Sequence, residues 1–190
     1  MKVEINKSMK LSEHFTLGEL CKTKHVTEDG NIPSHVSIEN LKRICENWLE
    51  DLRYSYNMLY VHSGVRPQSK VAGDCTLAPD PGAAPELGAA PASRKEEPSV
   101  INSGYRSPEV NRLAGGAKTS NHLSGCAVDI RCVGKEQMIR YASILLDIAD
   151  GTKQDYDELL LEQHGNICWL HFAVRPPSQG NRRKIDFLKG

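Results

Sequence analysis

The chain has 190 residues, the size of one ordinary domain or of one domain carrying an insertion. Its 24 Lys and Arg residues balance its 24 Asp and Glu residues, so the formal net charge is zero. This balance argues against a protein that binds nucleic acid or a membrane surface through a global positive field, and we expect no nucleic-acid partner. A hydrophobic fraction of 39% is enough for a core.

The N-terminal sequence MKVEINKSMKLSEHF has no continuous apolar stretch and no small-residue cleavage site. We therefore expect no secretory signal and synthesis in the cytoplasm. No apolar run approaches the roughly 20 residues that span a bilayer, so we expect no membrane insertion. The cysteines form no C-x-x-C pair, which argues against a cysteine zinc ribbon and, without a signal, favours reduced thiols.

Two helices are expected before residue 60. Within residues 11–24, Thr16 is a candidate N-cap and Glu19 completes a capping box, which predicts a small helix. Residues 37–54 keep their apolar side chains on one face, which predicts a longer helix that packs on the core, with Ser37 as its cap.

Residues 66–99 are dense in Pro, Ala and Gly and nearly free of large apolar side chains. Such a segment cannot bury enough surface to offset the entropy of ordering it. We therefore expect a single domain over residues 1–190 that is interrupted by a flexible insertion at 66–99.

The remaining chain alternates strands and helices. A strand is expected to end at 102–104. Ser107 as cap and Pro108 in the first turn predict a helix over 107–114. The pattern then predicts a strand at 126–132, a helix at 134–150, strands at 156–162 and 167–174, and an irregular polar tail from Arg175. This order favours an α+β domain with a small antiparallel sheet and packed helices.

Three residues in this region have the chemistry of metal ligands. His122 precedes the strand that carries Asp129, and His171 lies on the last expected strand. Strand side chains alternate between two faces, so Asp129 and His171 both lie opposite the expected core face and can converge with His122. Two imidazoles and a carboxylate suit Zn²⁺, and three protein ligands leave one position for water.

The residues around these ligands resemble a known family. The segment S-x-H-x-x-G-x-A-x-D, which runs from Ser120 to Asp129, is similar to the zinc motif of the D-alanyl-D-alanine carboxypeptidase family. Residues 103–107, SGYRS, and residues 169–171, WLH, resemble two further family segments, and the likeness spans 11–60 and 100–174. That family includes phage L-alanyl-D-glutamate endopeptidases and shares its fold with Hedgehog signalling domains. The short subtype of phages and prophages is the most similar.

The resemblance implies a role for each matching residue. His122, Asp129 and His171 would hold one zinc ion per chain. Arg106 would bind a carboxylate or carbonyl of the substrate, because a guanidinium offers forked donors to such oxygens. Further substrate-binding candidates are Ser120, Tyr105, which belongs to the SGYRS segment, and Trp169, which shares the strand face of His171.

The general base is less clearly marked. Many family members carry a Glu three residues before the last His, where this chain has Cys168. Glu162 matches an acidic residue of the phage-like subtype and is the first candidate. His164, in the loop that follows, is the second. A base here would take a proton from water and return it to the leaving amine.

The resemblance therefore implies a zinc-dependent peptidase that hydrolyses peptidoglycan stem peptides, at either the D-Ala–D-Ala or the L-Ala–D-Glu bond. We expect a monomer that reaches the cell wall after a phage-type release. Two alternatives stay open at this point. One is a zinc-binding module without activity, which the Cys168 departure motivates, and the other is a phage lysis or structural accessory protein.

Overall fold

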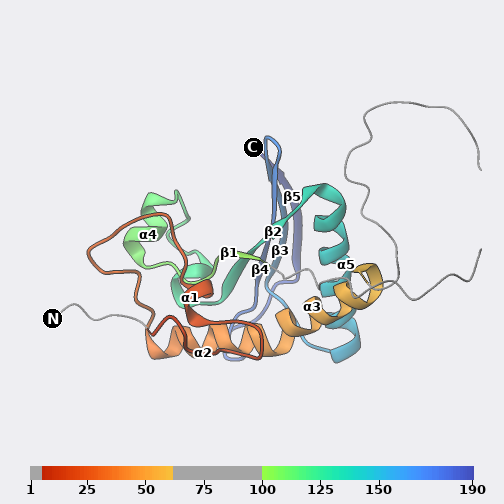
Figure 1. Ribbon diagram of the computed structural model, residues 1–190, viewed down its shortest axis with the longest axis horizontal. Helices are drawn as coiled ribbons and strands as arrows, with labels where there is room; N and C mark the ends of the chain where they lie inside the picture. The colour runs from red at the N-terminus through yellow and green to blue at the C-terminus, as the bar shows by residue number, and fades with distance from the viewer. Residues whose placement is uncertain (1–5, 62–99) are drawn as a thin grey trace, which may run out of the picture.

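The structure is a computed structural model that describes residues 6–61 and 100–190. The insertion expected at 66–99 lies outside these residues. Five strands form one sheet in the order β1-β2-β4-β3-β5 (Figure 1). In chain order the strands are β1 (Ile101–Ser103), β2 (Ala127–Cys132), β3 (Glu158–His164), β4 (Ile167–Ala173) and β5 (Lys184–Lys189).

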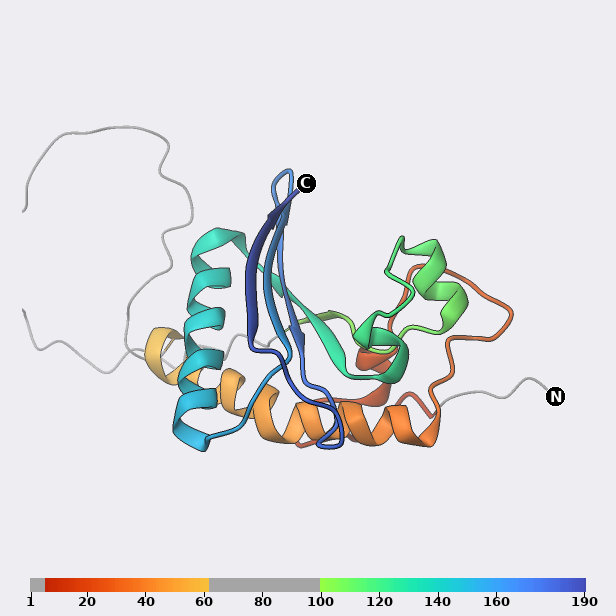
Figure 2. The ribbon, with the colours of Figure 1, turned by 180° about the vertical axis from the view of Figure 1, so that it is seen from behind.

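Helices occupy the two sides of this sheet unequally. They are α1 (Leu17–Leu20), α2 (His35–Ile44), η1 (Cys45–Leu49), α3 (Glu50–Tyr56), η2 (Asn57–Val61), α4 (Pro108–Leu113), η3 (Asn121–Ser124) and α5 (Gly134–Thr152). Figure 2 shows the sheet standing between α5 on one side and α4 on the other. None of the helices in the two described ranges is both long and apolar enough to cross a membrane.

The hydrophobic core lies between the sheet and the layer formed by the long helices. Trp48 of η1 packs against Phe172 of β4, with ring centroids 4.9 Å apart. Tyr56 at the end of α3 meets Tyr141 of α5 at 4.8 Å in an edge-on arrangement. All four rings are at most 2% exposed. Because aromatic side chains bury large areas, these contacts fix the helical layer on one face of the sheet and leave the other face for the site.

The predicted helices are confirmed, with one cap misplaced. Thr16 and Glu19 form the expected capping box at α1, and Ser107 caps α4. The cap of α2 is Ser34 and not Ser37, because the Ser34 hydroxyl accepts the Ser37 N–H at 3.1 Å. The apolar pattern missed this first turn because it begins with His35 and Val36, which are both exposed. The helix expected over 37–54 continues to Val61, with π-helical turns in η1 and η2.

The expectation of an antiparallel sheet followed by an irregular tail is wrong at one edge of the sheet. Strands β1, β2, β4 and β3 pair antiparallel as expected, but β5 pairs with β3 in parallel. The tail is held by ion pairs, from Arg182 to Asp157 at 2.7 Å and from Arg183 to Asp155 at 2.8 Å. Every residue of β5 is exposed. The sequence therefore lacks the alternation of buried and exposed residues that predicts a strand.

Gly125 gives a test of how η3 is fixed. Its φ of 70° is left-handed, and a Cβ at this position would lie 2.4 Å from the Ser37 carbonyl oxygen. We expect Gly125→Ala to lower the free energy of unfolding by about 2–5 kcal/mol, through backbone strain and steric overlap. Gly151→Ala is the matched control, because nothing lies within 4 Å of its Cβ position. Chemical denaturation that finds equal stability for the two variants would refute this packing.

Candidate metal centre

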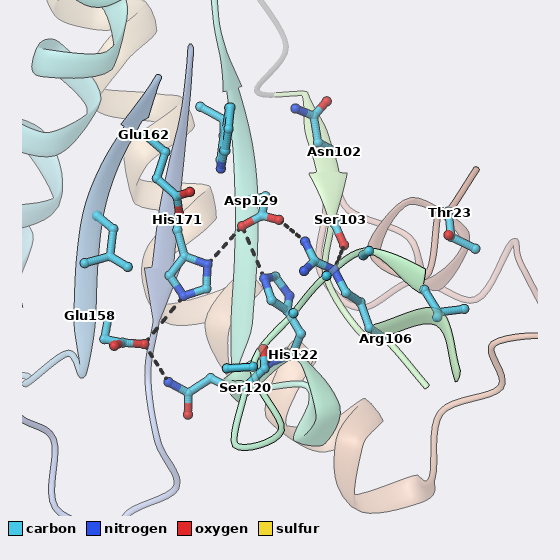
Figure 3. Close-up of a pocket in the computed structure, with 18 of the residues that line it drawn as sticks. Thr23, Asn102, Ser103, Arg106, Ser120, His122, Asp129, Glu158, Glu162 and His171 are labelled. Carbon is cyan, nitrogen blue, oxygen red and sulfur yellow. Dashed lines mark hydrogen bonds and ion pairs between the residues drawn. The ribbon is translucent and has the colours of Figure 1, made fainter. Parts of the chain in front are cut away.

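His122, Asp129 and His171 converge on one point in the structure (Figure 3). His122 is supplied by η3, Asp129 by β2 and His171 by β4. The antiparallel register places Asp129 directly opposite His171. Each residue offers one ligand atom, these atoms all lie within 4.8 Å of one another, and all three residues are buried. The sequence therefore predicted this grouping correctly.

The contacts of the two imidazoles show which nitrogens face the common point. Asp129 Oδ1 lies 3.2 Å from His122 Nε2 and 2.9 Å from His171 Nδ1. The other nitrogen of His122, Nδ1, is 2.5 Å from the Gly104 carbonyl oxygen. A carbonyl only accepts, so Nδ1 carries the hydrogen and Nε2 is left to act as a ligand. His171 would use Nδ1 in the same way, with its Nε2 turned to Glu158.

Local turns hold His122 in place. Ser120 is the N-cap of η3, and its hydroxyl accepts the His122 N–H at 3.3 Å. The His122 carbonyl accepts the Arg106 N–H at 3.1 Å and the Gly125 N–H at 3.2 Å. Both the ring and the backbone of His122 are therefore fixed before any ligand arrives, which is the preorganisation that a metal site needs.

The Asp129 carboxylate is stabilised as an anion despite its burial. Burial alone would raise its pKa, but the two histidines outweigh this and hold the pKa well below its usual range. Arg106 adds an ion pair from Nη2 to Asp129 Oδ2 and donates from Nε to the Ser103 hydroxyl at 2.8 Å. For His171, burial lowers the pKa, yet hydrogen bonds with Asp129 and Glu158 raise it to about 9. A metal bound at His171 Nδ1 would displace the proton that this nitrogen shares with Asp129.

The donor set fits Zn²⁺. Two imidazole nitrogens and one carboxylate oxygen are its common ligands, and a three-residue set leaves a position open. The nitrogens not turned toward the common point both meet an oxygen, as is usual for metal-bound histidines. The arrangement can therefore hold a zinc ion that stays accessible from the adjoining cavity.

Glu158 is a functional candidate that the sequence analysis missed. Its Oε2 lies 3.7 Å from His171 Nε2 and accepts the Asn121 side-chain N–H at 3.1 Å. Its Oε1 pairs with Arg182 at 2.9 Å. Glu158 thus orients His171 and is itself oriented by two partners. Glu158 lies at the start of β3, two residues before Leu160, which pairs with His171. The sequence does not give this β3–β4 register, so it did not mark Glu158.

A cavity of about 960 Å³ opens beside the three ligands. Of the other predicted site residues, Arg106, Ser120, Trp169 and Glu162 line it. Tyr105 does not, because its side chain is buried in the hydrophobic core. His164 also lies outside the lining, since it sits at the exposed end of β3 where the chain turns into β4.

Glu162 lines the same cavity as the three metal-ligand candidates. It is half-buried on β3 opposite Trp169, on the same sheet face as His171. Burial raises the pKa of its carboxyl group above the ordinary glutamate value. Cys168, by contrast, belongs to the hydrophobic core and alternates with Trp169 to the other face of β4. A carboxylate at position 168 of this backbone would therefore point into the core, and the cysteine there leaves the cavity intact.

Comparison with known proteins agrees with this geometry. A family model described as Peptidase M15 matches residues 80–155. No curated protein matches the chain. The matched stretch is less than half of the chain and contains His122 and Asp129, whereas His171 and Glu162 lie beyond it. The β2–β4 pairing adds His171 to the group independently of the family match. The match and the pairing together support a metal-dependent peptidase.

We predict that Glu158 governs metal affinity through His171. Glu158→Ala should raise the zinc dissociation constant about 10- to 100-fold, because a ligand that loses its outer hydrogen-bond partner is less well oriented. Glu158→Gln, which keeps an oxygen at this position, should lose less. Competition with a chromophoric chelator measures both. Glu109→Ala is the control, since Glu109 pairs with Arg112 on α4. Unchanged affinity in Glu158→Ala would rule out this role.

Proposed function

We propose that the protein is a zinc-dependent peptidase that hydrolyses peptidoglycan stem peptides. One observation carries the proposal. Three buried ligands from η3, β2 and β4 meet at the wall of a cavity that a half-buried glutamate, Glu162, also lines. A ligand set with one open position beside a carboxylate of raised pKa is the arrangement that metal-assisted amide hydrolysis needs.

The chain's own residues would divide the work. Zinc held by the triad would supply a Lewis acid that polarises the scissile carbonyl and makes water more acidic. Glu162 would accept the proton of the attacking water and then donate it to the leaving amine. Burial raises the pKa of Glu162, which makes its carboxylate a stronger base than that of an exposed glutamate and favours the first proton transfer, from the water.

The substrate would be held by the groups around the ligands. Arg106 already donates to Asp129 and Ser103, so it fixes the carboxylate ligand and has only its remaining N–H groups for a substrate oxygen. Trp169 offers an apolar surface beside His171. The peptidoglycan substrate is supported by the Peptidase M15 match and by the resemblance of the zinc motif. Both the D-Ala–D-Ala and the L-Ala–D-Glu bonds are candidates.

We predict that Glu162→Gln retains one zinc per chain and lowers hydrolysis of purified peptidoglycan about 10²- to 10⁴-fold, the usual contribution of a general base. His164→Ala is the matched variant from the same strand and should keep both zinc and activity. Metal analysis and chromatography of released peptides measure the two properties. Loss of activity in His164→Ala with full activity in Glu162→Gln would reverse the assignment of the base.

A further inference from the structure

The cavity extends beyond the triad to a wall made by residues 22–25, with the sequence Lys-Thr-Lys-His. Figure 3 shows Thr23 on the opposite side of the triad from Glu158 and Glu162, with Arg106 between them. All four residues of this segment, which we call the lysine wall, line the same cavity as the three ligands. A substrate that contacts Glu162 and the triad can therefore also reach the lysine wall.

The lysine wall is anchored by buried contacts to the segment that carries Arg106. The Tyr105 N–H donates to the Leu20 carbonyl oxygen at 2.7 Å, directly before the wall. Asn31, 3% exposed, donates to the Cys21 carbonyl oxygen at 2.9 Å and accepts the Ser107 N–H at 2.7 Å. Buried, satisfied polar groups such as Asn31 rigidify their surroundings. The wall thus has a fixed place relative to Arg106.

The charges of the cavity are divided between its two sides. The acidic lining residues are Asp129, at the triad, and Glu158 and Glu162 on β3. Lys22 and Lys24 flank Thr23, which lies on the opposite side of the triad in Figure 3. Both lysines are exposed, and within residues 6–61 and 100–190 neither ammonium group has an ion-pair partner. The arginines of the lining are already engaged: Arg106 with Asp129, Arg175 with Asp157, and Arg182 with Asp157 and Glu158.

We propose that the lysine wall is a subsite for a carboxylate of the substrate, so that the preferred substrate is a peptide with an acidic residue on the side of the scissile amide away from Glu162. Among the residues that the structure describes, no carboxylate pairs with Lys22 or Lys24, and an ammonium group binds a carboxylate as a point charge. The acidic side repels the same carboxylate, so the two sides together set the direction in which the peptide lies. This inference rests on the proposed function and specifies its substrate.

Two synthetic stem peptides test the subsite. They are identical except that the D-Glu residue carries a free carboxylate in one and a neutral amide in the other. Binding is measured by calorimetry on the full-length, zinc-loaded Glu162→Gln protein, so that cleavage does not interfere. The acid peptide should bind roughly 5- to 20-fold more tightly than the amide, as two partly exposed ion pairs allow, and the preference should shrink as salt is raised.

Charge reversal assigns that preference to the wall. Lys22→Glu/Lys24→Glu should abolish the preference for the acid peptide. Lys135→Glu/Lys153→Glu is the matched control, since it makes the same change in net charge at exposed positions at the two ends of α5 that do not line the cavity. It should keep the preference.

Three results would overturn the proposal, and they differ in what else they affect. The first is equal binding of the two peptides by the Glu162→Gln protein, and the second is an intact preference for the acid peptide in Lys22→Glu/Lys24→Glu. Either result refutes only the subsite, provided that protein with Glu162 still cleaves both peptides. Failure of both peptides to bind or to be cleaved refutes the subsite and the peptidase function together.

Discussion

The pairing of β2 with β4 is the constraint on which the rest of the site depends. It sets Asp129 opposite His171, and it does so through backbone hydrogen bonds that run the length of both strands. A shift of one residue would turn every side chain of one strand to the opposite face. The register is protected because the same strands bury Ile130, Leu170 and Phe172 completely in the core. The packing of one face thereby fixes the chemistry of the other.

Burying a carboxylate and two imidazoles is costly unless their charges and hydrogen bonds are matched. The structure meets this requirement with partners outside the triad. Gly104 accepts from His122, Arg106 pairs with Asp129, and Glu158 faces His171. Glu158 is in turn held by Asn121 and by Arg182 of the tail, so β5 and its connection support the site from the far edge of the sheet.

Much of this site could be predicted from sequence, because it is encoded by local patterns. Strand alternation and a ten-residue segment predicted which three residues converge, and turn residues such as Thr16 and Ser107 marked helix starts. Apart from the cap of α2 and the burial of Tyr105, the misses involve long-range pairing. β5 lacks a buried face, and its parallel pairing with β3 leaves no local trace. Glu158 matters only through the β3–β4 register, and the same register explains why His164 lies beyond the cavity.

We propose that the triad binds zinc through two nitrogens and one carboxylate oxygen, with an open fourth position. X-ray absorption spectroscopy of the zinc-loaded full-length protein tests it directly. We expect four nitrogen or oxygen neighbours at about 2.0–2.2 Å, two of them with the outer-shell signature of imidazole. A sulfur neighbour at about 2.3 Å would show that a cysteine binds the metal and would rule out this ligand set, as would protein that retains no zinc.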